Sequence, residues 1–81
     1  MKPCKEVEYC KKLFMSAGRI AGINILNFSN LTDREREVIL CRLIKGLTLK
    51  ECSELFVMEE DSVNKMQKRV CIKLYKFLTQ S

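Results

Sequence analysis

The fold of this chain is decided by residues 31–56, which read LTDREREVILCRLIKGLTLKECSELF. The stretch contains two capping boxes, TDRE at residues 32–35 and TLKE at residues 48–51. In a capping box the threonine hydroxyl accepts a hydrogen bond from the glutamate backbone N–H, and the carboxylate accepts one from the threonine N–H. One helix is therefore expected to begin in the first box and to end at Gly46, and a second to begin in the other box.

The spacing of apolar residues predicts how far the helices extend in this half of the chain. Apolar side chains recur with a helical period over residues 33–45, 49–56 and 60–78, and residues 57–59 form a tight connection. The apolar stripe of the last helix consists of Val63, Met66, Val70, Leu74 and Phe77. Two short capped helices joined by a tight turn, the second of them basic, follow the helix-turn-helix plan.

The N-terminal part of the chain also reads as helical. Apolar residues at helical spacing predict a helix over 3–16 that stops at Gly18, and a short helix over 19–27 follows. Residues 1–30 are thus expected to form a helical segment that either interacts with a partner or completes the core. With residues 31–81 as the helix-turn-helix domain, the fold class is all-α, with four to five helices and no sheet.

Composition argues against an enzyme. The chain has 81 residues, of which 47% are apolar and 31% charged, and it contains no histidine, so the commonest general base and metal ligand is missing. None of its three glycines has phosphate-cradle spacing. We expect no catalytic residues, no metal and no cofactor.

Five cysteines without a C-x-x-C pair are expected to be reduced thiols, with Cys41 and Cys52 facing inward as small apolar side chains. The first residues resemble no secretory signal, and no run approaches the roughly 20 apolar residues of a membrane span. A cytoplasmic protein is therefore expected.

The net charge of +5 is concentrated at the C-terminal end. Residues 1–30 carry five basic and two acidic side chains, and residues 31–61 carry five basic and eight acidic ones. Residues 62–81 carry five basic side chains and no acidic one. This pattern is typical of a surface that contacts phosphates, although a solvated basic face that aids solubility has the same composition. The candidate phosphate contacts on the last helix are Lys65, Lys68, Arg69 and Lys73.

The run LTDREREVI at residues 31–39 resembles the opening "LT-x-RE-x-EVL" of two families of bacterial DNA-binding domains. One is region 4 of sigma factors, which binds the −35 promoter element, and the other is the LuxR-type regulators. The spacing from Val38 to Gly46 fits the sigma pattern better, and GLTLKE at residues 46–51 is similar to the sigma turn into the scaffold helix. Ser62-Val63 matches a pair early in the sigma recognition helix, so the resemblance covers residues 31–78.

The resemblance implies how such a domain would hold the DNA backbone. Arg34 matches an arginine that contacts promoter phosphate, and Arg69 matches a basic phosphate contact on the recognition helix. Thr48 and Leu49 match residues that approach the backbone at the start of the scaffold helix. Sigma region 2 has no counterpart here, so a complete sigma factor is not expected.

The resemblance also implies which residues would face the bases. Asp61 matches an acidic residue that accepts from a cytosine amino group, and Asn64 and Lys65 match polar positions that read bases. Ser62 completes this set at the helix start. An acid at a helix start is also a common dipole or capping residue, so Asp61 has a second, purely structural interpretation.

Two departures from the sigma pattern favour a protein partner. The acidic run at residues 59–61 lies where the helix tip would enter the major groove, and Glu59 replaces the usual serine or threonine cap. Apolar residues are also expected to face outward together, namely Leu40, Ile44 and Leu55 with Cys71 or Tyr75. The sequence thus predicts a DNA-binding transcription regulator of a bacterium or phage, which could act with RNA polymerase or as a homodimer. The alternative is a module of the same fold that engages RNA polymerase or a sigma factor without reading DNA.

Overall fold

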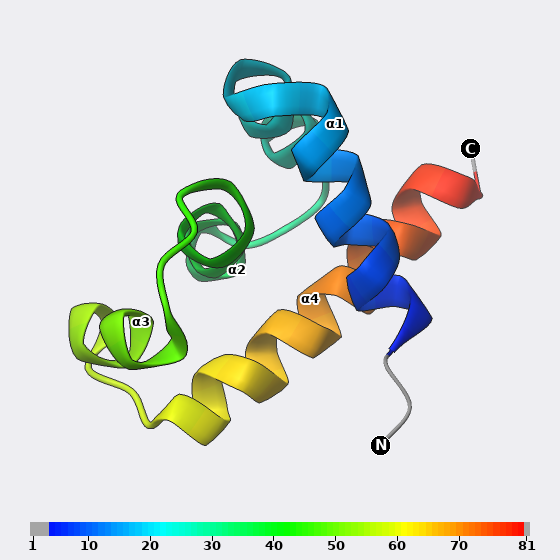
Figure 1. Cartoon of the computed structure of the whole chain (residues 1–81). Helices are drawn as coiled ribbons and strands as arrows, with labels where there is room; N and C mark the ends of the chain where they lie inside the picture. Colours follow the sequence, from blue (N-terminus) through cyan, green and yellow to red (C-terminus); the bar gives the residue numbers. More distant parts are fainter. Residues whose placement is uncertain (1–3, 81) are drawn as a thin grey trace.

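A computed structural model describes residues 4–80 of the chain. Within this range the chain forms helices and no strand, which confirms the all-α class (Figure 1). Along the chain the elements are α1 (Lys5–Phe28), α2 (Asp33–Ile39), the π-helical turn η1 (Leu40–Ile44), α3 (Leu49–Phe56) and α4 (Glu60–Thr79). The expected helix over 3–16 begins at residue 5 in the structure, and its residue 3 lies outside the described residues.

Both predicted capping boxes are formed. The Glu35 N–H donates to the Thr32 hydroxyl at 3.2 Å, and the Glu35 carboxylate accepts from the Thr32 N–H at 2.9 Å. Thr48 and Glu51 repeat this exchange at 3.1 and 3.0 Å. The helix from the first box keeps its expected length, but its last turn widens into η1, a feature that the sequence did not predict.

Gly18 divides α1 into two helical halves that run in different directions. Its backbone has φ 83° and ψ 177°, a combination that is essentially restricted to glycine. The predicted stop at this residue and the short helix after it are both confirmed. Figure 1 shows the change of direction between the blue and the cyan parts of α1, which brings residues 19–28 back beside α2.

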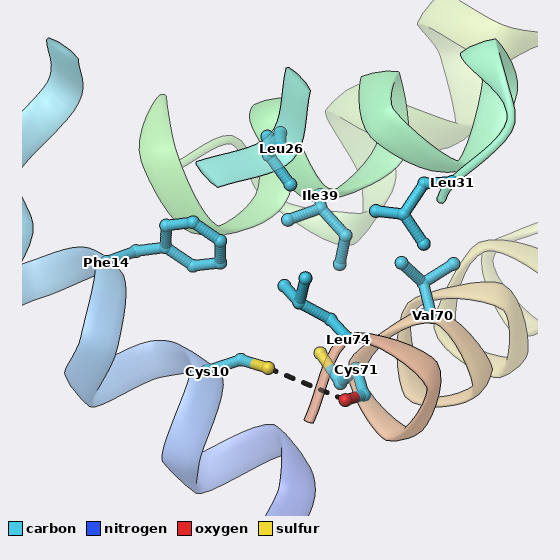
Figure 2. Packing of buried hydrophobic residues seen from close by; sticks show 8 residues of the cluster. All are labelled: Cys10, Phe14, Leu26, Leu31, Ile39, Val70, Cys71 and Leu74. Atoms are coloured by element: carbon cyan, nitrogen blue, oxygen red, sulfur yellow. Dashed lines mark hydrogen bonds between the residues drawn. The ribbon is translucent and has the colours of Figure 1, made fainter. Parts of the chain in front are cut away.

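One hydrophobic cluster joins α1 to the C-terminal half of α4. Its buried members come from α1, α2, α4 and the connection before α2 (Figure 2): Cys10, Phe14, Leu26, Leu31, Ile39, Val70, Cys71 and Leu74. The N-terminal segment therefore shares a core with α4.

A second cluster holds α3 against the N-terminal half of α4. Its buried members are Val38, Cys41, Cys52 and Val63, and Met66 packs against both clusters. Cys41 and Cys52 are 1% and 0% exposed, which confirms their predicted inward positions.

The outward apolar face expected from the sequence is largely covered by α1. Cys71 is fully buried, and Leu40 and Ile44 are half-buried and pack against the first cluster. Tyr75 meets the ring of Tyr9 edge to face, with the centroids 5.0 Å apart. The prediction that these four residues form an exposed docking surface is wrong, because the N-terminal helices of the same chain occupy that face.

The close approach of α1 to η1 depends on Gly22. A Cβ atom at this position would lie 3.0 Å from Phe14 Cδ1 and 3.1 Å from Ile44 Cδ1. The absence of a side chain therefore lets the second half of α1 lie directly on Ile44.

Glu35 links the start of α2 to α4. Besides capping α2, its Oε1 atom lies 3.1 Å from Lys73 Nζ, and its side chain is only 12% exposed. The hydrogen bond from the Thr32 N–H, followed by the contact with Lys73, holds the pKa of the Glu35 carboxyl below its usual range.

This lowered pKa predicts acid sensitivity. A carboxyl whose pKa is depressed in the folded state contributes stability that is present above its unfolded pKa of about 4.3 and is lost as the pH falls through the folded value. The variant Glu35→Gln removes this titration, so its free energy of unfolding should decrease less between pH 6 and pH 3 than that of the parent. Urea unfolding at both pH values measures the difference. Glu37→Gln, which changes an exposed carboxylate of the same helix, is the control, and an unchanged decrease in Glu35→Gln would contradict the assignment.

The backbone at Gly18 predicts a second effect on stability. Gly18→Ala meets no atom within 4 Å of the added Cβ, so its cost comes from the backbone conformation alone. We expect a loss of about 1–3 kcal/mol in the free energy of unfolding. Ser16→Ala, at an exposed site two residues earlier, should change it by less than about 0.5 kcal/mol. Equal stability of the two variants would show that the chain does not need the turn at residue 18.

Candidate nucleic-acid interface

A tight turn over residues 57–59 connects α3 to α4. At the end of α3 the Met58 N–H donates to the Ser53 carbonyl at 2.9 Å, and Val57 adopts a left-handed conformation with φ 53°. Glycine usually occupies this position in such helix ends, and a β-branched residue is strained there. The turn nevertheless places the start of α4 directly after α3, as the sequence predicted.

The first half of α4 buries one face and exposes the other. Val63, Gln67 and Val70 point into the protein, in register with the predicted stripe. All six α4 residues of the predicted DNA-binding set are exposed: Asp61, Ser62, Asn64, Lys65, Lys68 and Arg69. Positions 61, 64, 65 and 68 follow one another at helical spacing, so their side chains share one face of the helix. The structure thus brings the predicted α4 residues together on one surface.

The predicted residues outside α4 are held by other contacts. The Thr48 hydroxyl accepts from the Glu51 N–H as an N-cap, and the half-buried Leu49 side chain packs on the second cluster. The Arg34 guanidinium donates to the Phe56 carbonyl at 3.4 Å and lies 5.5 Å from the centre of the Phe56 ring. Arg34 therefore ties α2 to the end of α3, and binding a phosphate would require it to leave or share this contact.

Lys73 is also engaged within the protein. It pairs with Glu35, which leaves Lys65, Lys68 and Arg69 as the basic side chains in the first half of α4 that have no counter-ion among the described residues.

The tip of α4 is acidic and uncapped. Glu59, the N-cap residue, makes no side-chain hydrogen bond to the first turn, and Glu60 and Asp61 follow it in exposed positions. Among residues 4–80 the Asp61 side chain makes no hydrogen bond, so its structural role is limited to the favourable interaction of a negative charge with the helix dipole. The exposed face of α4 is thus negative in its first turn and positive in the next two turns.

A polar link inside the domain was missed by sequence reasoning. Gln67 is 4% exposed, and its Oε1 atom accepts from Arg42 Nε at 2.8 Å, while Arg42 also donates to the carbonyl of Leu47 before α3. The link fixes α4 relative to η1 and to the connection that precedes α3. A glutamine on the apolar stripe between Val63 and Val70 was the signal, because a buried amide needs a partner.

Three of the buried thiols have raised pKa values. Burial raises the pKa values of Cys41 and Cys52, and a hydrogen bond with Cys10 together with burial raises that of Cys71, so these thiols carry little thiolate. Within residues 4–80, no three cysteine or carboxylate side chains gather as metal ligands would. No helix in the same part of the chain combines the length and apolar character that crossing a membrane requires.

No protein-family model, curated protein or solved structure matches this chain. The resemblance to sigma region 4 therefore rests on the motif residues alone.

The uncapped start of α4 leads to a prediction on stability. Glu59→Thr supplies the hydroxyl acceptor that the Ser62 N–H lacks, whereas Glu59→Ala removes the same charge without supplying a cap. The threonine variant should therefore unfold with a free energy about 0.5–2 kcal/mol higher than the alanine variant in urea titrations. Identical unfolding of the two variants would show that residue 59 does not act as the N-cap.

Proposed function

We propose that this chain is a DNA-binding transcription regulator that inserts the first half of α4 into the major groove. The observation that carries the proposal is the shared exposed face of α4, on which Lys65, Lys68 and Arg69 have no counter-ion among the described residues. The major groove is about 12 Å wide and admits an α-helix. Because the opposite face packs on α1, α2 and α3, α4 is held as a rigid reading element.

The exposed face divides naturally between backbone and base contacts. Lys65, Lys68 and Arg69 are the phosphate contacts, since long basic side chains one to two turns into the helix reach the groove walls. Asp61, Ser62 and Asn64 lie at the tip, and a carboxylate or amide there can pair with a cytosine amino group or an adenine edge. The proposal leaves Arg34, Thr48 and Leu49 as supporting contacts at the start of α2 and α3.

A second function, binding of a protein such as RNA polymerase, is favoured by a different surface. Leu55 is 60% exposed and the strained Val57 is 90% exposed. Together with Phe56 they border a hollow whose other side is lined by Asp33, Arg34 and Glu37 of α2. An exposed apolar group beside carboxylates suits a basic, apolar partner segment better than it suits DNA.

A triple variant tests the DNA-binding proposal. Lys65→Ala, Lys68→Ala and Arg69→Ala together should weaken binding to duplex DNA while leaving the helical content unchanged, because all three side chains are exposed. Each lost phosphate contact should flatten the slope of log affinity against log salt by roughly 0.9. Fluorescence anisotropy at two or more salt concentrations gives this slope.

A charge-matched control separates a specific face from net charge. Lys11→Ala, Lys12→Ala and Arg19→Ala remove the same three charges from exposed positions on α1. This control should bind DNA nearly as the parent does, since only long-range attraction is reduced. If the α4 variant binds as tightly as the parent at low salt, or if both variants lose the same affinity, the proposed reading face is wrong.

Adding RNA polymerase to the same assay distinguishes the two functions. A DNA reader binds duplex DNA without polymerase, and a polymerase-bound factor joins DNA only in its presence. In the second case, Leu55→Glu with Val57→Glu should abolish the effect of polymerase, whereas the α4 variant should not.

A further inference from the structure

The second half of α1 has an outer face that none of the described residues covers. Gly22 and Leu26 point inward from residues 19–28 and are buried. On the other side, Ile20 is 79% exposed, Phe28 81% and Ile23 36%. Large apolar side chains so fully exposed on one short helix are unusual in a small monomer, where such patches mark interaction sites.

This outer face is electrically neutral in a molecule with a net charge of +5. Residues 20–30, which read IAGINILNFSN, contain no charged side chain. Asn24 and Asn27 lie at helical spacing between the apolar residues and are exposed. A neutral face offers nothing to attract DNA, an acidic protein or a basic protein, so its complement is another neutral, apolar face.

A hollow lies next to this face. It has a volume of about 250 Å³ and is bordered on one side by Ile23, Leu26 and Asn27 of α1. The other side is formed by the charged residues Asp33, Arg36 and Glu37 of α2, with Leu40 of η1 at its apolar edge. An apolar side chain of a docking partner can enter only along the edge formed by Ile23, Leu26 and Leu40.

We propose that the outer face of residues 20–28 binds the same face of a second copy of this chain, forming a twofold-symmetric dimer. In such an interface the same patch of surface on both copies forms the contact. A patch with a net charge would therefore repel its copy, whereas a neutral patch does not. Side-chain amides suit this symmetry because each carries both donors and an acceptor, so Asn24 and Asn27 can pair with the same residues of the partner. The protomers are otherwise positively charged and repel each other, which leaves this neutral face as the favoured place of contact. The dimer does not depend on the proposed DNA binding.

Sedimentation of the parent and of a charge-bearing variant tests the dimer. The parent should pass from monomer to dimer as its concentration rises from about 1 to about 100 µM. Ile20→Glu with Phe28→Glu places like charges across the twofold axis and should weaken the dimer by roughly a hundredfold or more. Both side chains are about four-fifths exposed, so the circular dichroism spectrum should stay that of the parent. Leu55→Glu with Val57→Glu, which changes exposed apolar residues elsewhere, should dimerise as the parent does.

Mixing variants of opposite charge provides the rescue. Ile20→Lys with Phe28→Lys should also be monomeric alone, and an equimolar mixture with the glutamate variant should form a mixed dimer. A parent that stays monomeric at about 100 µM overturns the proposal, and the face then belongs to a different partner. Persistent dimers of the glutamate variant, or failure of the mixture to pair, overturn it as well.

Discussion

The apolar stripe of α4 is the constraint on which the rest of the structure depends. This helix buries Val63 against α3 and, two turns later, Val70 and Leu74 against α1. Met66 lies between them and packs against both clusters. Neither half of the chain could bury its apolar surface without this helix, because a domain of this size leaves a large part of its surface exposed even when folded. The two clusters therefore determine which side of α4 faces solvent. The proposed DNA-binding face lies on the side of α4 opposite the buried stripe.

The sequence predicted the parts of the fold that depend on local chemistry. The capping boxes at Thr32 and Thr48 set the helix starts, and Gly18 and Gly46 end helices because their backbone angles suit glycine. What the sequence did not predict depends on contacts between distant residues. Leu40 and Cys71 are predicted to face outward, but α1 covers both of them. Its first half meets Cys71, where Cys10 Sγ donates to the Cys71 carbonyl, and its second half, after Gly18, lies beside Leu40. For the same reason, the pairing of Arg42 with Gln67 could be suspected from a polar residue on the stripe but not assigned.

The candidate site was predictable to a similar degree. The helical period correctly placed Asp61, Lys65 and Lys68 on one exposed face, because a stripe of buried residues fixes the opposite face of the same helix. It gave no means to tell that Lys73 pairs with Glu35 or that Arg34 is held by Phe56, since both partners come from other helices. DNA binding remains a prediction. The affinity for DNA would depend on two opposed effects along α4, namely repulsion of phosphates by the acidic first turn and their attraction to Lys65, Lys68 and Arg69. Salt weakens both the repulsion and the attraction. The attraction depends on salt more steeply, because each phosphate contact releases counterions from the DNA.

The four buried cysteines can report local opening of the two hydrophobic clusters. Cys10 and Cys71 lie in the cluster that joins α1 to α4, and Cys41 and Cys52 lie in the cluster that holds α3. A buried thiol reacts with a thiol-modifying reagent only when its surroundings open, so its labelling rate reports the free energy of that opening. The even division of the thiols between the clusters means that the two ends of α4 can be followed separately by mass spectrometry, with no label introduced. If α3 detaches before α1, the reagent should modify Cys41 and Cys52 first. If the domain opens as a unit, it should modify all four thiols at the same rate.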